Sequence, residues 1–382
     1  MTTDINKRKI LFRLRSMETG GVQKVLCDII KNLPSDLDLY LLLNLKQGEM
    51  LPLIPDNIKV FSLVEGRENF SKNPLVNKLQ LVFRRLKLEL YHLFPSLIKN
   101  KIGFVPDVEI AFTSSEYKAL LESPFKKSKK IGWFHVDIRD AAFIEQTKLT
   151  IIDQLKRLDL SVFVSQQTRN IIKEVYHVEF PKSMIIYNPF EFNVIREKAH
   201  AFEVDFKTSA PVFISLGRLI PRKGNKILVE AHKKLIDKGL RHSIWVFGNG
   251  QEKEMLTDLI KEYQLEDSFI IHEPVINPYP YIKKADFYVL PSKSEAYPLV
   301  IGEALTLGKP IVSTDAGGVK EMMDHEVNGL IVDYDADQLA EGMERLLTDH
   351  EWVEKIKENN KTAYLRFENE KIYSQITEIL KN

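Results

Sequence analysis

The chain has 382 residues, of which 44% are apolar and 28% are charged, with a formal net charge of +1 and one cysteine. These values exclude a disordered chain, a collagen-like repeat and a small disulfide scaffold, and the near-zero charge disfavours a general nucleic-acid binder. At about 150 residues per domain, the length predicts two lobes rather than one core.

The sequence carries no feature of export or of membrane insertion. We find no stretch of about 18 uncharged apolar residues, so no membrane span is predicted. The polar stretch 1–9 leads into a strand of about six residues, which is too short for the apolar core of a signal peptide. Cys27 lies in an apolar helical pattern and is expected to be buried, and no Cys/His cluster has zinc spacing. These features favour a cytoplasmic protein.

The first half of the chain alternates short apolar runs with helical patterns. A strand is predicted at 9–15, a helix at 20–33, and further strands at 37–45, 108–112, 130–136, 160–165 and 184–188. This alternation is typical of a parallel sheet with helices on both faces.

A basic amphipathic helix is predicted within residues 72–101. Its apolar residues recur every three or four positions: Leu75, Leu79, Val82, Phe83, Leu86, Leu90, Leu93 and Leu97. Most of its basic residues lie on the other side: Lys78, Arg84, Arg85 and Lys87. The pattern fits a helix lying on anionic lipid, and it also fits a surface helix that buries its stripe against its own lobe. A second basic run, from Lys126 to Lys130, either is a solvated loop or joins the same patch.

The second half of the chain starts a new series after the polar stretch 191–209. Strands are predicted at 211–218, 242–248, 269–274, 287–292 and 309–315, a helix at 224–238, and helices over 350–382. The fold class is therefore α/β, with two doubly wound lobes and a cleft between them, since such sheets bind ligands at the carboxyl ends of their strands.

The two halves of the chain differ in charge. Residues 1–200 hold 31 basic and 23 acidic residues, whereas residues 201–382 hold 23 basic and 30 acidic residues. This asymmetry suggests that the first lobe faces something anionic.

The stretch 291–321, PSKSEAYPLVIGEALTLGKPIVSTDAGGVKE, contains two glutamates eight positions apart. Glu295 follows a strand, and Glu303 lies near the start of a helix whose N–H groups favour an anion. A carboxylate in such a place can accept two hydroxyls of one sugar ring. The pair also fits an acid and base for glycoside hydrolysis, or two structural residues at a helix start.

Other candidate residues also lie where strands end. Gly20 and Gly21 form the turn between the first strand and helix, where a backbone can approach a phosphate. Arg218 and Lys223 follow the first strand of the second lobe, where two cations can neutralise a diphosphate. His135 ends a strand of the first lobe, two residues before Asp137, which is expected to be structural or to face an acceptor.

Taken together, these motifs resemble the retaining glycosyltransferases of family 4, and the resemblance extends over nearly the whole chain. It implies the GT-B fold, with two Rossmann-like lobes that face a central cleft. The first lobe, 1–195, would bind the acceptor, and the second, 196–365, would bind a nucleotide sugar. The terminal helix, about 366–382, would pack back onto the first lobe.

The resemblance also assigns roles to single residues. Glu303 would hold the ribose hydroxyls and Glu295 would lie near the donor sugar. His135 would lie beside the sugar, and Val275 would contact the base. The diphosphate would be bound by Arg218, Lys223, Gly20, Gly21 and the backbone N–H groups of Leu299 and Val300. The chain departs from the family pattern at His272-Glu273-Pro274, where a glycine is usual, and at Ala296-Tyr297, where Gly-Phe is common.

The implied reaction transfers a hexose or N-acetylhexosamine from a nucleoside-diphosphate sugar, with UDP favoured, to a glycan or lipid-linked glycan. It would need no metal and no other cofactor, and Asp335 and Asp337 are expected to be solvated. The reaction would take place in the cytoplasm, and the protein would contact an anionic membrane peripherally through residues 72–101. The alternatives are a nucleotide-sugar epimerase of the same fold and a non-catalytic nucleotide-sugar-binding protein.

Overall fold

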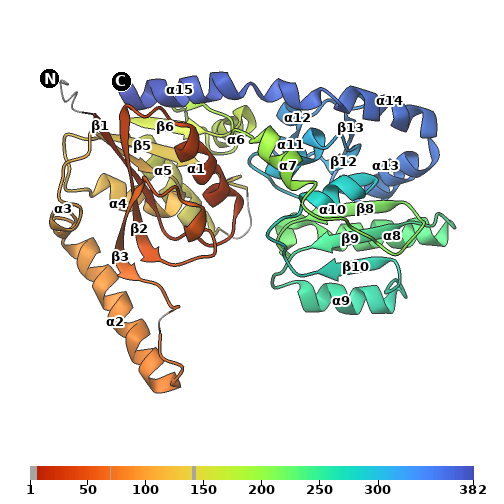
Figure 1. Ribbon diagram of the computed structural model, residues 1–382, viewed down its shortest axis with the longest axis horizontal. Helices are drawn as coiled ribbons and strands as arrows, with labels where there is room; N and C mark the ends of the chain where they lie inside the picture. The colour runs from red at the N-terminus through yellow and green to blue at the C-terminus, as the bar shows by residue number, and fades with distance from the viewer. Residues whose placement is uncertain (1–6, 69, 140–142) are drawn as a thin grey trace.

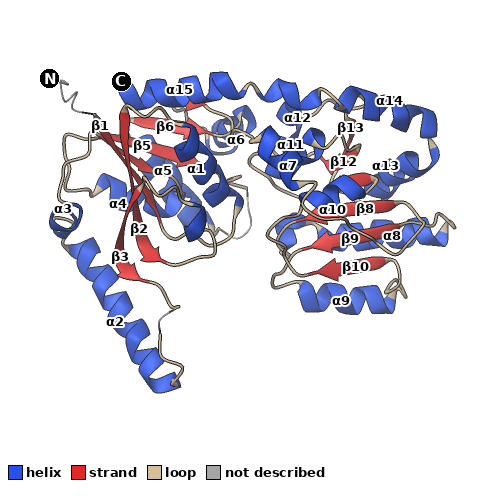
Figure 2. Cartoon of the chain, in the orientation of Figure 1, coloured by secondary structure: helices blue, strands red, loops and turns tan. Residues whose placement is uncertain are grey.

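Two parallel β-sheets organise the computed structural model, which describes residues 7–68, 70–139 and 143–382 (Figures 1 and 2). The first sheet has the strand order β3-β2-β1-β4-β5-β6-β7. Its strands are β1 (Arg8–Leu14), β2 (Leu37–Lys46), β3 (Lys59–Glu65), β4 (Val108–Ala111), β5 (Lys129–Phe134), β6 (Leu160–Phe163) and β7 (Ser183–Ile185). The stretch 1–6, which begins the segment weighed as a signal sequence, lies outside the described residues.

The second sheet repeats the same winding, with the order β10-β9-β8-β11-β12-β13. Its strands are β8 (Val212–Leu216), β9 (Ser243–Phe247), β10 (Phe269–His272), β11 (Phe287–Leu290), β12 (Ile311–Thr314) and β13 (Gly329–Val332). Each sheet reverses its winding once, between β1 and β4 and between β8 and β11, and these are the places where open α/β sheets bind ligands. The predicted fold class, two doubly wound α/β lobes, is confirmed.

Helices cover both sheets, as Figure 2 shows. Those of the first part of the chain are α1 (Gly21–Asn32), α2 (Pro74–Leu93), α3 (Leu97–Ile102), α4 (Tyr117–Leu121), α5 (Glu145–Lys156), α6 (Gln166–Tyr176) and α7 (Phe192–Lys198). The later ones are α8 (Asn225–Asp237), α9 (Lys253–Glu262), α10 (Tyr279–Lys284), α11 (Leu299–Thr306), α12 (Val319–Met322), α13 (Ala336–Thr348), α14 (His350–Asn360) and α15 (Asn369–Lys381). Central strands such as β4 and β11 are buried along their whole length, as parallel strands covered on both faces must be.

The last helix returns to the first sheet. In Figure 1, α14 and α15 run along the top of the molecule, from the second lobe to the first. The Lys381 ammonium forms an ion pair of 2.5 Å with Asp36, and Lys129 donates to the carbonyl oxygen of Ile379 at 3.1 Å. Tyr373 donates to Glu191 at 2.9 Å. The end of the chain therefore ties the two sheets together.

The helix α2 differs from the other long helices because none of its residues is buried. It projects from the first lobe, at the lower left of Figure 1. Leu75 is 76% exposed, Phe83 69% and Leu93 73%. The expectation that this stripe packs against its own lobe is therefore wrong. No helix in the described ranges is long and apolar enough to cross a membrane.

Two further expectations can be compared with the structure. Cys27 is buried in the first core, as predicted. The basic run that begins at Lys126 is not wholly a solvated loop, because Lys129 and Lys130 begin β5. The Lys130 ammonium forms an ion pair with the buried Glu109, so part of the excess positive charge of this run is compensated internally.

Candidate active site

The predicted donor-side segments meet where the two lobes face each other. Gly21 begins α1, directly after the β1 turn, and Leu299 begins α11 in the second lobe. A Cβ placed on Gly21 would come within 3.3 Å of the Leu299 side chain. Two backbone segments that the sequence assigned to one diphosphate therefore lie side by side, although they are far apart along the chain. Small side chains on the first-lobe turn permit this approach.

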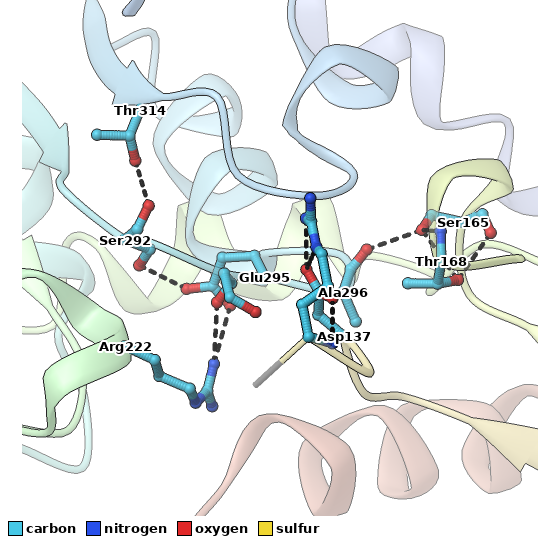
Figure 3. Close-up of polar contacts among 10 residues, drawn as sticks. Asp137, Ser165, Thr168, Arg222, Ser292, Glu295, Ala296 and Thr314 are labelled. Atoms are coloured by element: carbon cyan, nitrogen blue, oxygen red, sulfur yellow. Dashed lines mark hydrogen bonds and ion pairs between the residues drawn. The ribbon is translucent and has the colours of Figure 1, made fainter. Parts of the chain in front are cut away.

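The buried carboxylate of Glu295 is the electrostatic centre of the second-lobe side. Lys223 donates to its Oε1 at 2.5 Å, and the Ser292 hydroxyl donates to the same oxygen at 2.7 Å. Its Oε2 lies 3.7 Å from the guanidinium of Arg222 (Figure 3). Burial alone would raise the pKa of Glu295, but Lys223 and Arg222 hold this pKa below its usual value. Glu295 is therefore an anion that orients two cations.

Backbone contacts fix the loop that carries Glu295. The Ser165 hydroxyl, at the start of α6 in the first lobe, donates to the carbonyl oxygen of Ala296 at 2.9 Å, as Figure 3 shows. Thr314 at the end of β12 donates to the carbonyl oxygen of Ser292. Gly317 has a φ of +55°, and a Cβ there would lie 1.6 Å from the carbonyl oxygen of Glu295. The loop is thus held from both lobes and leaves no room for a side chain at position 317.

The cations of this site come from the loop after β8. Lys223 and Arg222 belong to the single 3₁₀ turn Pro221–Lys223, and Arg222 also donates to the carbonyl oxygen of Ser294 at 3.2 Å. Arg218 lies earlier in the same loop, with its side chain exposed. Of these two residues the sequence analysis named only Lys223, but the structure places both beside Glu295. The position of Arg222 directly before Lys223 was the available signal.

The second glutamate has its own set of partners. Glu303 lies on α11 and is buried, and Lys24 of α1 donates to its Oε1 at 2.5 Å across the lobes. The Tyr279 hydroxyl, from the start of α10, donates to the same oxygen at 3.1 Å. Burial would lower the pKa of Lys24, but Glu303 raises this pKa well above its usual value, so the ammonium is charged. Neither Lys24 nor Tyr279 was named by the sequence analysis.

The backbone of α11 completes the donor side. Leu299 and Val300 are its first two residues, and both are partly exposed. The N–H groups of a first helical turn lack partners within the helix and favour negative charge. They can therefore donate to phosphate oxygens between the cation loop and Gly21.

His135 lies directly after β5, at the carboxyl edge of the first sheet. Its ring packs 4.7 Å from the ring of Phe112 and is stacked on Trp133. Its Nε2 is buried and has no hydrogen-bond partner within the described chain. Burial lowers the pKa of His135 to about 3, so the imidazole is neutral at physiological pH. A neutral imidazole can accept or donate one hydrogen bond to a sugar hydroxyl.

Two neighbouring residues have structural roles. Asp137 is buried and accepts from Arg139 through its backbone N–H at 2.9 Å and its guanidinium at 2.7 Å. The carboxylate of Asp137 is thus used to stabilise this short turn. Tyr297, one of the departures from the family pattern, is buried and stacks on Tyr187 with ring centroids 5.2 Å apart. It faces the core between the lobes.

The loop between β10 and α10 is where the base was expected. Val275 is partly buried and packs on the main core, while the next residue, Ile276, is fully exposed. His272, at the end of β10, packs against the rings of Trp245 and Phe247 on the neighbouring strand β9, so its ring serves packing. Although residues 272–274 lack the glycine that is usual in the family, the backbone around Val275 still lies at the carboxyl edge of the sheet.

Acidic residues outside this site serve other contacts. Asp335 accepts from the N–H groups of Asp337 and Gln338 and thereby caps α13. Asp337 forms an ion pair of 2.6 Å with Lys234. Across the described ranges, no three or more His, Cys, Asp or Glu side chains group in a way that could hold a metal ion.

The chain is similar to known glycosyltransferases. Residues 196–363 match the family model of the glycosyl transferases group 1. The match covers the second lobe, which is therefore similar to a group 1 glycosyltransferase domain. Glu295, Glu303, Arg218 and Lys223 all lie within it. The whole chain is also similar to a Campylobacter jejuni protein named N-acetylgalactosamine-N,N'-diacetylbacillosaminyl-diphospho-undecaprenol 4-alpha-N-acetylgalactosaminyltransferase, with 24% identity over 380 residues that cover 96% of this chain and 97% of that protein.

Solved structures extend the similarity to both lobes. HepE of Anabaena, in complex with UDP and glucose, superposes with a TM-score of 0.79 at 21% identity and covers 98% of this chain and 99% of that chain. Sucrose-phosphate synthase of Thermosynechococcus elongatus superposes with a TM-score of 0.75 at 17% identity and covers 98% of each chain. The two lobes together therefore have the GT-B fold.

Proposed function

We propose that this protein is a retaining glycosyltransferase that moves a hexose or N-acetylhexosamine from a UDP-sugar to a glycan or lipid-linked glycan in cell-surface polysaccharide synthesis. The observation that carries the proposal is the buried Glu295 with Lys223 and Arg222 around it, on the loop that leads to Leu299 beside the Gly21 turn. Cations, helix N–H groups and a tight glycine turn converge there, which is the chemistry that a diphosphate leaving group requires.

The main requirement of the reaction is to stabilise the negative charge on the departing diphosphate. As the bond between the sugar's anomeric carbon and the β-phosphate oxygen breaks, negative charge grows on that oxygen. Arg218, Lys223 and the first N–H groups of α11 would stabilise this charge, without a metal ion. The acceptor oxygen would attack from the same face, and its proton would pass to the leaving phosphate. Configuration at the anomeric carbon is then retained.

The remaining residues would bind the two ends of the donor. We assign the ribose hydroxyls to Glu303, the base to the backbone around Val275, and the sugar hydroxyls to Glu295 and His135. Because Glu303 already accepts from Lys24 and Tyr279, the nucleotide would share this carboxylate with them or displace them. The neutral ring of His135, with its unpartnered Nε2, suits a sugar hydroxyl better than a phosphate.

The names and bound ligands of similar proteins support the proposed donor and the proposed acceptor. HepE is the similar structure that was solved with UDP and glucose, and the Campylobacter relative is named for transfer to a diphospho-undecaprenol-linked sugar. A putative colanic acid biosynthesis glycosyltransferase of Escherichia coli is 32% identical over 139 residues. These names support a role in polysaccharide synthesis, and we propose that the protein acts at the cytoplasmic face of the membrane.

A release assay tests the proposal. The purified protein is incubated with UDP-, GDP- and ADP-sugars in the presence of a chelator, and free nucleoside diphosphate is measured. We expect slow release from a UDP-sugar, and about 10²–10³-fold slower release by Arg218→Ala, as for loss of one oxyanion donor. Lys226→Ala is the matched control, because Lys226 is an exposed lysine on α8 that forms an ion pair of 3.7 Å with Glu230.

The outcomes separate the three candidate functions. An epimerase would convert the donor sugar without releasing nucleotide, and product analysis would detect this. A non-catalytic protein would bind UDP in calorimetry and release none from any donor, even with cell-envelope glycolipid extract as an acceptor source. Either outcome contradicts the transferase.

A further inference from the structure

The helix α2 has two faces with opposite relations to the rest of the protein. The inner face contacts the first lobe: Gln80 accepts from the N–H of Ser71 at 2.8 Å, and Arg84 donates to Gln47 at 3.1 Å. Leu88 and Tyr91 continue this face and pack on a small core beneath the first sheet. At about 100° per residue, positions 80, 84, 88 and 91 form one side of the helix.

The apolar stripe occupies the side that points away from the lobe. Its members are Leu75, Leu79, Val82, Phe83, Leu86, Leu90 and Leu93, all between 44% and 76% exposed. Soluble monomers rarely expose so long a continuous apolar surface, so the stripe marks an interaction site. In Figure 1 the outer part of this helix projects beyond the first sheet, beside the connection that leads from β3 into it.

The charges along the stripe are almost all positive. Lys78 and Arg85 line one border and Lys87 the other, and all three are exposed. Across residues 72–101 there are seven lysines and arginines and one acidic residue, Glu89. An apolar stripe with basic borders is complementary to a lipid surface, whose acyl region accepts the apolar side chains and whose anionic headgroups attract the bases.

We propose that α2 docks the protein on an anionic lipid membrane through this stripe. A second copy of the chain is disfavoured as the occupant, because pairing two such stripes would bring lysines and arginines of both copies together. Peptide partners of opposite charge would cover the bases and leave most of the apolar side chains in water.

The docked position also suits the acceptor. In Figure 1, α2 extends past the carboxyl ends of β2 and β3, the edge of the first sheet at which Gly21 and His135 lie. A membrane along α2 would therefore run beside this edge of the first sheet, where the acceptor is expected to bind. The acceptor of the proposed reaction is then a lipid-linked glycan rather than a free sugar, a step that rests on the transferase function proposed above.

Vesicle cosedimentation tests the docking. Wild-type protein is centrifuged with vesicles of phosphatidylcholine alone and with vesicles that also contain phosphatidylglycerol. We expect binding only to the second kind, and weaker binding as salt is added. Leu79→Asp/Leu86→Asp should bind at least about tenfold more weakly, and Lys78→Glu/Arg85→Glu/Lys87→Glu at least about a hundredfold, because the loss of each basic residue weakens binding by roughly a factor of five.

A matched variant controls for total charge. Lys261→Glu/Lys284→Glu/Lys355→Glu changes the charge equally at exposed positions of the second lobe and its terminal helices, and it should bind vesicles like the wild type. All variants should keep the wild-type thermal midpoint and the wild-type release of UDP without vesicles, so a failed transferase and a failed docking surface are distinguishable.

Three results would overturn the docking proposal. Wild-type protein could stay in the supernatant with anionic vesicles, or the stripe variant could sediment like the wild type. In the third case, sedimentation velocity without vesicles would show a wild-type dimer that the stripe variant loses, which identifies a second copy as the occupant. Loss of UDP release with vesicle binding intact would instead refute the transferase alone.

Discussion

Lys24 and Glu303 form an ion pair of 2.5 Å that joins α1 of the first lobe to α11 of the second. The side chain of Glu303 is 8% exposed and that of Lys24 is 28% exposed, so the pair is largely withdrawn from water. The same carboxylate is the proposed ribose ligand. Nucleotide binding and contact between the lobes therefore compete for, or share, one buried acidic group.

The first prediction concerns Lys24→Met, which leaves Glu303 without its cation. Removal of one partner from a largely buried pair should lower the free energy of unfolding by about 2 kcal/mol, discounted for the partial exposure of Lys24. Because ribose hydroxyls can replace the lost donor, UDP should raise the thermal midpoint of the variant more than that of the wild type. Lys31→Met, at an exposed position of the same helix, is the control. Equal UDP shifts in both proteins would show that Glu303 does not meet the nucleotide.

The second prediction separates the two glutamates by matched substitutions. Glu303→Gln should raise the Kd for UDP by about tenfold, because a charge-assisted hydrogen bond to the ribose becomes a neutral one. Glu295→Gln should change this Kd by less than about threefold yet lower turnover of the UDP-sugar, because it disturbs the cations beside the diphosphate and the sugar. Titration calorimetry and the release assay measure the two effects. A similar loss of UDP affinity in both variants would contradict the division of roles.

The strands at the sheet centres were predictable because burial on both faces requires continuous apolar runs, as in β8 and β11. The two strands that the sequence analysis missed, β3 and β13, are both at sheet edges. β3 carries Lys59 and Glu65 at its ends, and β13 is an apolar stretch of four residues, Gly329–Val332. Polar ends and a short run both weaken the sequence signal of a strand, so pairing with the neighbouring strand decides these two.

The site was predictable where local sequence carries the chemistry and not where tertiary contact does. Glu295 and Lys223 stand beside strand ends and turns, which the pattern around them marks. Lys24, by contrast, occurs in an amphipathic helix at a position that suits a solvated lysine, and only the approach of the second lobe brings Glu303 to it. The exposure of the α2 stripe was equally hidden, because periodicity identifies an apolar face without stating what covers it.

The third prediction concerns the tight backbone at Gly317. Gly317→Ala places a Cβ 1.6 Å from the carbonyl oxygen of Glu295, so the Glu295 loop must move. Gly308 has a similar φ, +69°, but a Cβ there meets nothing within 4 Å. Both alanines carry the left-handed strain of about 1–2 kcal/mol, and only the first carries the clash.

We therefore expect Gly308→Ala to lower the thermal midpoint by a few degrees, at about 4 °C or less per kcal/mol for a chain of this size, and to keep normal turnover. Gly317→Ala should lose most of its UDP release even where it remains folded by circular dichroism. Normal turnover in Gly317→Ala would show that the position of the Glu295 loop is not needed for the reaction.

The fourth prediction follows from two buried histidines in the second lobe. His232 Nδ1 and His242 Nε2 share a hydrogen bond of 2.7 Å, and His232 Nε2 is 2.8 Å from the Ser268 hydroxyl. Burial, reinforced by the neighbouring His242, lowers the pKa of His232 to about 2, and burial also lowers that of His242. The folded protein therefore keeps both rings neutral, while the unfolded chain protonates them near pH 6.5.

Because the unfolded state binds more protons below pH 6.5, stability should be full above that value and should fall as the pH drops. His232 alone accounts for a loss of about 2 kcal/mol between pH 7 and pH 5. Urea unfolding measured across this range should show the decline, and His232→Leu/His242→Leu should be less stable at pH 7 but with a clearly shallower pH dependence. His135 also has a lowered pKa, so some slope should remain in the double variant. An unchanged slope in that variant would show that the two rings do not titrate on unfolding.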